Sequence, residues 1–172
     1  MGVAPNKIFS STFSLLYNLL NSHVTDPIAA SRNKTQGSTK WIFASFPDAD
    51  ITDAKIKYPI LIIEPANSSF LNWTFTKNVA NMMLGFTAYS LSMEQADSIF
   101  DACISTMDAQ RPYLKANGLT QLLLTGTTSD FIAHNGTKVH FRSATYTAQF
   151  YFKHGLSKKT ETQTLTSGGV IA

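Results

Sequence analysis

Two groups of side chains in this sequence could bind a metal ion. Asp48, Asp50 and Asp53 stand close together in a polar stretch and resemble part of a calcium-binding loop. The glycine and the closing glutamate of an EF-hand loop are missing, so we interpret the stretch as a solvated acidic turn. His134 and His140 flank a predicted hairpin, but two histidines without a third ligand make a weak metal site. We therefore expect no bound metal.

Two single residues could take part in catalysis. Glu64 ends an apolar run, a position where α/β enzymes place acids, yet no base or nucleophile in the sequence can be paired with it. Cys103 falls on the apolar stripe of a predicted helix, which favours a buried structural thiol. As the only cysteine, it excludes an intrachain disulfide. Phosphate-loop, dinucleotide-binding and nucleophile-elbow motifs are missing, so we expect no enzymatic activity and no cofactor.

The composition is that of a lightly charged globular protein. Hydrophobic residues make up 44% of the 172 residues, but charged residues only 15%, against about 25% in typical domains. The net charge of +3 is too small to predict nucleic-acid binding by itself. Apolar runs are much shorter than the ~20 residues that cross a bilayer, so we expect no membrane partner.

Two helices carry most of the helical signal. In residues 7–24, Phe9, Phe13 and Leu16 share one apolar face, as helical spacing requires. The opposite face holds only uncharged polar residues: Ser10, Ser11, Ser14, Asn18, Asn21 and Ser22. The second helix begins after Ser92, which forms a predicted capping box with Gln95, and its pattern ends near Pro112.

Several strands are predicted around these helices. Residues 60–63 form a continuous apolar run that predicts a central strand buried on both faces. Asn135-Gly136 is a strong two-residue hairpin signal. The remaining predictions are a loop at 25–40, a short strand at 40–45, a turn at 66–72, one or two strands at 73–90, and strands at 119–124, 130–134 and 137–153.

These elements predict an α+β fold, with a mainly antiparallel sheet and two principal helices packed mostly on one face. We expect residues 1–154 to form one domain and the polar segment 155–172 to be a flexible C-terminal tail.

Charge is segregated along the second helix. Glu94, Asp97, Asp101 and Asp108 project on one side of it, opposite the apolar stripe. The loops carry the opposite sign at Arg32, Lys34, Lys40, Lys55 and Lys57, and the C-terminal stretch adds Lys153, Lys158 and Lys159. The acidic stripe is either a solvated face or a surface that meets the basic loops of an identical neighbour, as in head-to-tail rings. Ser14 and Asn18 on the first helix lie either on a weakly polar surface or on a face that another protein chain covers.

The order, length and residue pattern of the predicted helices and strands resemble those of a known protein family. The chain runs from the N-terminal helix to YPILIIEP, NVANMMLGFTAYS, LSMEQADSIFDACISTMDAQ and QLLLTGTTSDFIAHNGTKVHFRSATYTAQFYF. In this order it is similar to the tail terminator, or tail completion, proteins of long-tailed bacteriophages. The resemblance covers residues 7–152 and rests on no diagnostic motif, so no functional residue is transferred.

The resemblance implies a small α+β subunit of the virion tail, assembled in the host cytoplasm and located at the head–tail junction. It would form a ring, a hexamer in this family, that caps the tail tube and ends tail growth. The implied partners are further copies of the chain, the tail tube protein and the head completion or connector protein, with DNA passing through the channel without sequence-specific binding.

Other functions stay open at the level of sequence. The chain could be another head–tail component, such as a stopper, an adaptor or a tube subunit. It could also be a small hydrolase that uses Glu64 or the His134/His140 pair, or a nucleic-acid-binding module that uses the basic loops.

Overall fold

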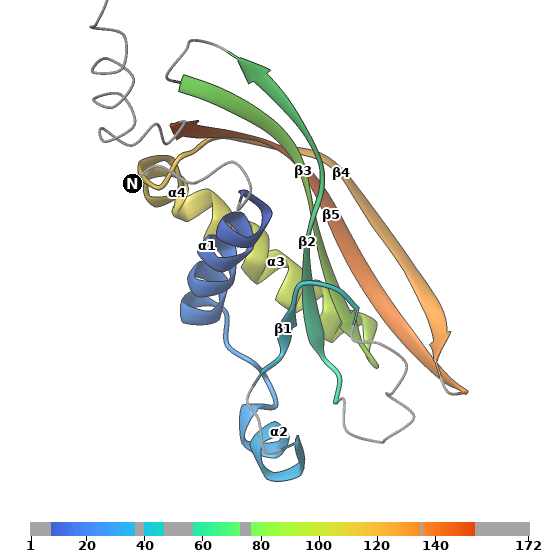
Figure 1. Cartoon of the computed structure of the whole chain (residues 1–172). Coiled ribbons are helices and arrows are strands. Elements are labelled where there is room, and N and C mark those ends of the chain that lie inside the picture. Colours follow the sequence, from blue (N-terminus) through green and yellow to red (C-terminus); the bar gives the residue numbers. More distant parts are fainter. Residues whose placement is uncertain (1–7, 37–39, 47–56, 73–76, 135, 154–172) are drawn as a thin grey trace, which may run out of the picture.

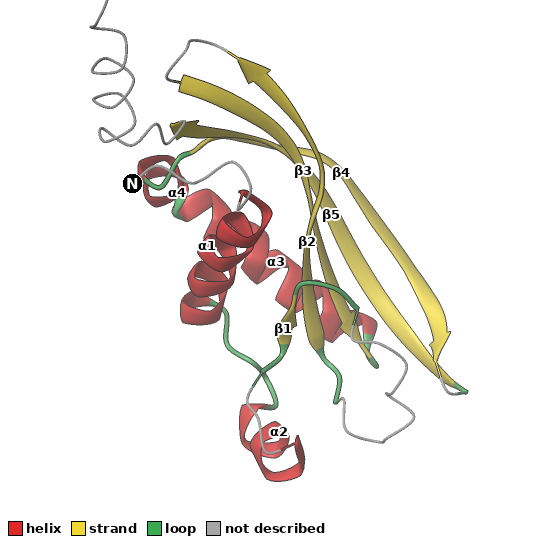
Figure 2. Cartoon of the chain, in the orientation of Figure 1, coloured by secondary structure: helices red, strands yellow, loops and turns green. Residues whose placement is uncertain are grey.

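The computed structural model describes residues 8–36, 40–46, 57–72, 77–134 and 136–153. It confirms the α+β class: a five-stranded mixed sheet carries α1, α3 and α4 along one face, while α2 stands apart from that face (Figures 1 and 2). In chain order the elements are α1 (Ile8–His23), α2 (Ala29–Gln36), β1 (Ile42–Phe43), β2 (Ile60–Asn72), β3 (Lys77–Ser90), α3 (Met93–Ala109), α4 (Arg111–Ala116), β4 (Leu119–His134) and β5 (Thr137–Lys153).

The strands follow the order β1-β2-β3-β5-β4. The pairs β2–β3, β3–β5 and β5–β4 are antiparallel, and only β1 runs parallel to its neighbour. Residues 60–63 are buried, as their apolar run predicts. The run also lies between two strands, as predicted, because Leu61 and Ile62 pair with β1 and all four residues pair with β3, which holds the middle of the sheet.

The core lies between the sheet and the helices. On β3 the alternate residues that pack in it are Ala80, Met82, Leu84, Phe86 and Ala88. The helices contribute buried side chains such as Leu16 and Leu20 from α1 and Ile99 and Cys103 from α3. The apolar face of the sheet therefore packs against the apolar faces of the helices, as the two-residue spacing in the strands and the helical spacing in the helices predict.

Residues 66–72, expected to be a turn, form the second half of β2. They pair with β3 from Ala66↔Met83 to Asn72↔Asn78, with a register shift between Ala66 and Ser68. Pro65 is tolerated in this strand because β1 reaches only to Ile62, and no described strand lies on that side of β2 beyond it. Residues 73–76 lie outside the described part, so only Lys77–Ser90 of the expected long strand is observed.

One prediction about helices needs correction, and one short helix was not predicted. The stretch 25–40, expected to be a loop, contains α2, and Arg32 on this helix is completely buried. The second helix ends at Ala109, shortly before Pro112, as predicted, and Pro112 itself lies in the first turn of the unpredicted α4, where its missing N–H has no intrahelical acceptor to lose.

The capping box of α3 is also not formed as predicted. Ser92 is the N-cap residue with extended backbone angles, but its side chain makes no capping hydrogen bond. Gln95 instead accepts a hydrogen bond from the hydroxyl of Ser90, with 2.6 Å between Oγ and Oε1. This hydrogen bond, and not the predicted capping box, links the end of β3 to the start of α3.

The long hairpin at the C-terminal end of the sheet follows the prediction in part. Gly136 has a φ of 74°, as a tight hairpin turn requires. β4 is one strand of 16 residues where two shorter strands were expected. β5 pairs with β3 in one register, and the two register shifts of the β4–β5 pair fall at Leu119/Gln121 and Leu124/Gly126 of β4. No helix in the described ranges is long and apolar enough to cross a membrane.

Candidate self-association surface

The sheet has two edges with unused backbone groups. β4 forms one edge, and no described residue pairs with its outer side. At the other edge, β1 pairs only with Leu61 and Ile62, so β2 has no described neighbour on that side from Ile63 onward. Unpaired N–H and C=O groups in an extended strand can form hydrogen bonds with another strand. β4 therefore has the geometry to extend the sheet, and so has β2 except at Pro65, which carries no N–H, and at the register shift between Ala66 and Ser68.

β4 lacks most of the features that usually prevent pairing at an edge, although its pairing with β5 has register shifts at Leu119/Gln121 and Leu124/Gly126. Natural edge strands are short, or they carry lysine, proline or inward-pointing charges. β4 spans 16 residues, contains no proline, and has Asp130 as its only Asp, Glu, Lys or Arg. It also exposes large apolar side chains, with 56% of Leu123, 41% of Leu124 and 53% of Phe131 accessible. Such a strand is typical of an association site.

The face of the sheet that carries no helix is polar but weakly charged. Met83 on β3 is 44% exposed there, and Thr87 donates a hydrogen bond to Ser143 on β5 with 3.0 Å between the hydroxyl oxygens. Tyr89 contacts the rings of Phe46 and Phe141 at centroid distances of 5.1 and 5.5 Å. Few ions would have to be desolvated if another protein covered this face.

The acidic stripe of α3 is partly neutralised within the chain. Asp97 binds the guanidinium of Arg142 on β5. Asp108 binds Arg111 at 2.8 Å, on an exposed surface. Glu94 and Asp101 are exposed, and the described residues show no ion pair for either. The charge that α3 offers to a neighbour is therefore smaller than the sequence pattern indicates.

The predicted basic surface is reduced as well. Arg32 does not belong to it: its side chain is buried with Asp26, at 2.7 Å between Nε and Oδ2, and also donates to the carbonyls of Lys57 and Pro59. Lys57 is half-buried and donates to the hydroxyl of Ser31 at 3.0 Å. Lys40 is exposed, with its ammonium 5.2 Å from the centroid of the Phe43 ring.

Several predicted basic positions cannot be placed. Lys55, Lys158 and Lys159 lie outside the described residues, as do the side chains of Lys34 and Lys153. Asp48, Asp50 and Asp53 of the acidic turn, and the segment 155–172, lie outside them too.

The outer face of α1 is uncharged, as predicted. Ser14 and Asn18 are both exposed. The buried side of the same helix carries Leu16, Leu19 and Leu20. Ser14 and Asn18 are therefore accessible to another chain, and their part in an interface stays a prediction.

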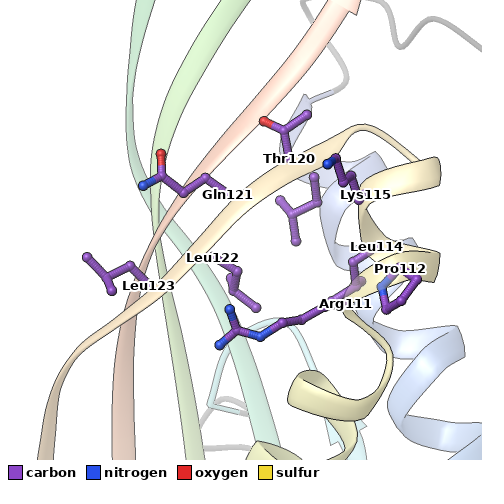
Figure 3. Close-up of a pocket in the computed structure, with 9 residues that line it drawn as sticks. Arg111, Pro112, Leu114, Lys115, Thr120, Gln121, Leu122 and Leu123 are labelled. Atoms are coloured by element: carbon purple, nitrogen blue, oxygen red, sulfur yellow. The ribbon is translucent and has the colours of Figure 1, made fainter.

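A hollow of about 620 Å³ lies between α4 and β4. Leu114 on α4 and Leu119 and Leu122 on β4 give it an apolar floor, and Arg111 and Lys115 stand at its rim. In Figure 3, Arg111 extends from α4 toward Leu122, whereas Leu123 points to the other side of β4. The sequence pattern does not predict this hollow, because the hollow depends on the short helix α4, for which the sequence gives no periodic signal.

The residues considered for catalysis do not come together in the described part of the chain. Glu64 is exposed on β2, and His140 lies on β5 beside Phe131, with 6.5 Å between ring centroids. Cys103 is buried, and burial raises the pKa of its thiol to about 12. Within the described ranges, no group of three or more His, Cys, Asp or Glu side chains is arranged to hold a metal ion.

Comparisons with known proteins give limited information. No family model matches the sequence, and no curated protein matches it. Among solved structures, the chain is similar to one in the "Virion of native gene transfer agent (GTA) particle", with a TM-score of 0.38 and 10% sequence identity. The similarity covers 81% of this chain and 93% of the other. These values do not assign the chain to a family.

Proposed function

We propose that this protein is a structural subunit of a phage-like virion, and that it forms the tail terminator ring at the head–tail junction. The resemblance of its segments to tail terminator proteins suggests this role. The observation that carries the proposal is the pair of open sheet edges, at β4 and at the second half of β2. A subunit with one open edge of each kind can bind copies of itself head to tail.

The strand directions suit such a junction. β2, β3, β5 and β4 alternate in direction across the sheet. A second copy that places its β2 beside β4 continues this alternation, because β2 and β4 run in opposite directions. The junction is then an ordinary antiparallel pair, the more stable of the two ladder types.

β1 limits where the neighbour can bind. It occupies the edge of β2 at Leu61 and Ile62, so an incoming β4 pairs from Ile63 onward. The incoming strand is therefore shifted along β2 by the same amount at every junction. A closed ring needs this shift and the rotation between subunits to be constant.

In this role the ring would cap the tail tube, end tail growth and join the tail to the head connector, while DNA passes through its centre. Its partners would be further copies of itself, the tail tube protein and the head completion protein. The junction needs only surfaces that exclude water and match in shape.

The test compares two leucines that are equally exposed but differently placed. Leu123 lies on the edge strand β4, and Leu91 lies in the turn before α3; each is 56% exposed. Leu123→Lys puts a charge on the edge, which is how natural proteins prevent edge pairing. Leu91→Lys adds the same charge away from both edges and is the matched control.

We expect light scattering and negative-stain electron microscopy to show closed rings for the wild type and for Leu91→Lys. Leu123→Lys should remain monomeric and keep the wild-type circular dichroism spectrum. Addition of purified tail tubes should give capped tubes with the wild type only. A wild type that stays monomeric and ignores tubes overturns the proposal, and equal assembly of both variants overturns the role of the β4 edge.

A further inference from the structure

We infer that the hollow between α4 and β4 receives α1 of the neighbouring copy, so that the ring is closed by a helix contact as well as by strand pairing. This inference rests on the proposed function, because it needs the head-to-tail junction between β4 and β2. It assigns a specific occupant to a surface feature that the fold of one subunit leaves open.

Strand pairing by itself provides little contact area. The open part of β2 is about ten residues long, roughly 33 Å, and at the ~4.8 Å strand spacing it covers only about 160 Å². A stable protein–protein interface buries about 800 Å² on each partner. Most of the interface must therefore come from side chains beside the junction, on the helix face, on the opposite face, or on both.

The arrangement of the helices determines which element reaches the hollow. Within one subunit, α1 packs on β2, α3 packs on β3 and β5, and α4 packs on β4. By these contacts the helix layer follows the order of the strands, with α1 on the β2 side and α4 on the β4 side. When β2 of a second copy extends the sheet beyond β4, its α1 is the helix that comes next to α4.

The surfaces of the hollow and of α1 are compatible. α1 contains no Asp, Glu, Lys or Arg, so it brings no like charge toward Arg111 and Lys115. Its exposed face carries Ser14 and Asn18, whose oxygen atoms can accept hydrogen bonds from these cations. Phe9 at the start of the helix is 43% exposed and supplies an apolar group for the leucine floor.

The acidic face of α3 has better opposite charge for Arg111 and Lys115, but its position is unsuitable. α3 lies over β3 and β5, in the middle of the sheet. It reaches the hollow of another copy only if the strands do not join edge to edge. The α3 face is therefore the alternative occupant that the experiment must separate from α1.

Cross-linking between single introduced cysteines tests the contact. Cys103 is buried and its raised pKa keeps the thiol protonated, so it stays silent in mild oxidation of the native protein. We would mix Ser14→Cys protein with Lys115→Cys protein and oxidise the assembled rings. The matched control replaces Ser14→Cys by Ser98→Cys, an exposed serine on α3.

We expect disulfide-linked dimers that contain one chain of each kind in the Ser14→Cys mixture and none in the Ser98→Cys mixture. Cross-links only in the control mixture would place α3 in the hollow and overturn the inference. Rings that form normally and give cross-links in neither mixture would also overturn it, while leaving the proposed function intact. A wild type that forms no rings overturns both.

A charge exchange gives an independent measurement. Ser14→Lys brings a cation toward Arg111 and Lys115, and we expect it to raise the concentration for half-assembly by about tenfold or more, since like charges at an interface are strongly unfavourable. Lys115→Glu in the same chain should restore assembly to within about threefold of the wild type. Additive effects of the two substitutions would show that the residues do not meet.

Discussion

At the level of single residues, Arg32 shows how local sequence can mislead about charge. Its neighbours in the sequence are polar, and this local pattern predicts a solvated basic surface. In the structure its side chain is completely buried, binds both carboxylate oxygens of Asp26 and donates to two carbonyl groups at the start of β2. Its partners are 6 to 27 residues away, so no local pattern could reveal the pairing.

Replacing Arg32 by methionine should destabilise the protein strongly. The substitution leaves the Asp26 carboxylate buried without its cation, and losing one partner of a buried pair costs about 3–5 kcal/mol of unfolding free energy. Urea denaturation followed by circular dichroism measures the change. The control is Arg111→Met, which breaks an ion pair with both side chains more than half exposed and should change stability by less than about 1 kcal/mol. Equal effects of the two substitutions would contradict the assigned role of Arg32.

At the level of elements, hydrophobic periodicity predicts which face of each helix and strand is buried, and packing confirms it. Periodicity does not predict which strands pair with each other. The apolar stripes of α1 and α3 and the alternation along β3 were read from residue spacing, because each element buries one face in the same core. The second half of β2 was predicted as a turn because residues 66–72 have turn-forming side chains. Pairing with β3 overrides that preference, and it joins residues distant in sequence.

The hairpin between β4 and β5 gives a prediction about turn geometry. Gly136 has a φ of 74°, where a side chain is strained whatever the space around it. We expect Gly136→Ala to lower the unfolding free energy by about 1–2 kcal/mol, since residues with a Cβ disfavour this region. Gly126 in β4 has open space around its Cα and no positive φ, so Gly126→Ala should be nearly neutral. Thermal denaturation compares the two, and a harmless Gly136→Ala would contradict the turn assignment.

For the whole molecule, the sequence indicated a surface suited to contact with other chains but could not locate it. Low charge and the uncharged face of the first helix were visible in the composition and spacing. The two open edges and the hollow beside α4 were not, because they depend on the order of the strands in the sheet. The long uncharged run of residues 119–129 was the available signal, and it was read as separate segments.

The acidic stripe of α3 makes a prediction about assembly. Asp97 and Asp108 already bind Arg142 and Arg111 of their own chain, so Glu94 and Asp101 are the residues left to attract a neighbour. Since α3 lies away from both edges, these charges act on a neighbour at a distance and not by contact, and we expect the double reversal Glu94→Lys and Asp101→Lys to weaken ring assembly at low salt and to leave the fold intact. Sedimentation velocity at low and high salt measures this, and the difference should shrink at 1 M salt, where the Debye length is about 3 Å.

The outcome distinguishes two uses of the stripe. If assembly at low salt is the same for the double variant and the wild type, the stripe is a solvated face and the edges alone determine the association. Reversing Asp97 would be less informative, because it also removes a contact between α3 and β5.

In the proposed head-to-tail assembly β4 and β2 are unlike edges, so every added subunit would leave one vacant site of each kind at the two ends of the growing arc. Growth would stop only when the free β4 edge at one end of the arc pairs with the free β2 edge at the other. This requires that 360° be a whole multiple of the rotation between neighbouring subunits. A small change in strand twist at this junction would convert closed circles into open spirals. The twist angle between β4 and the β2 strand of the next subunit would thus determine the diameter of the central channel.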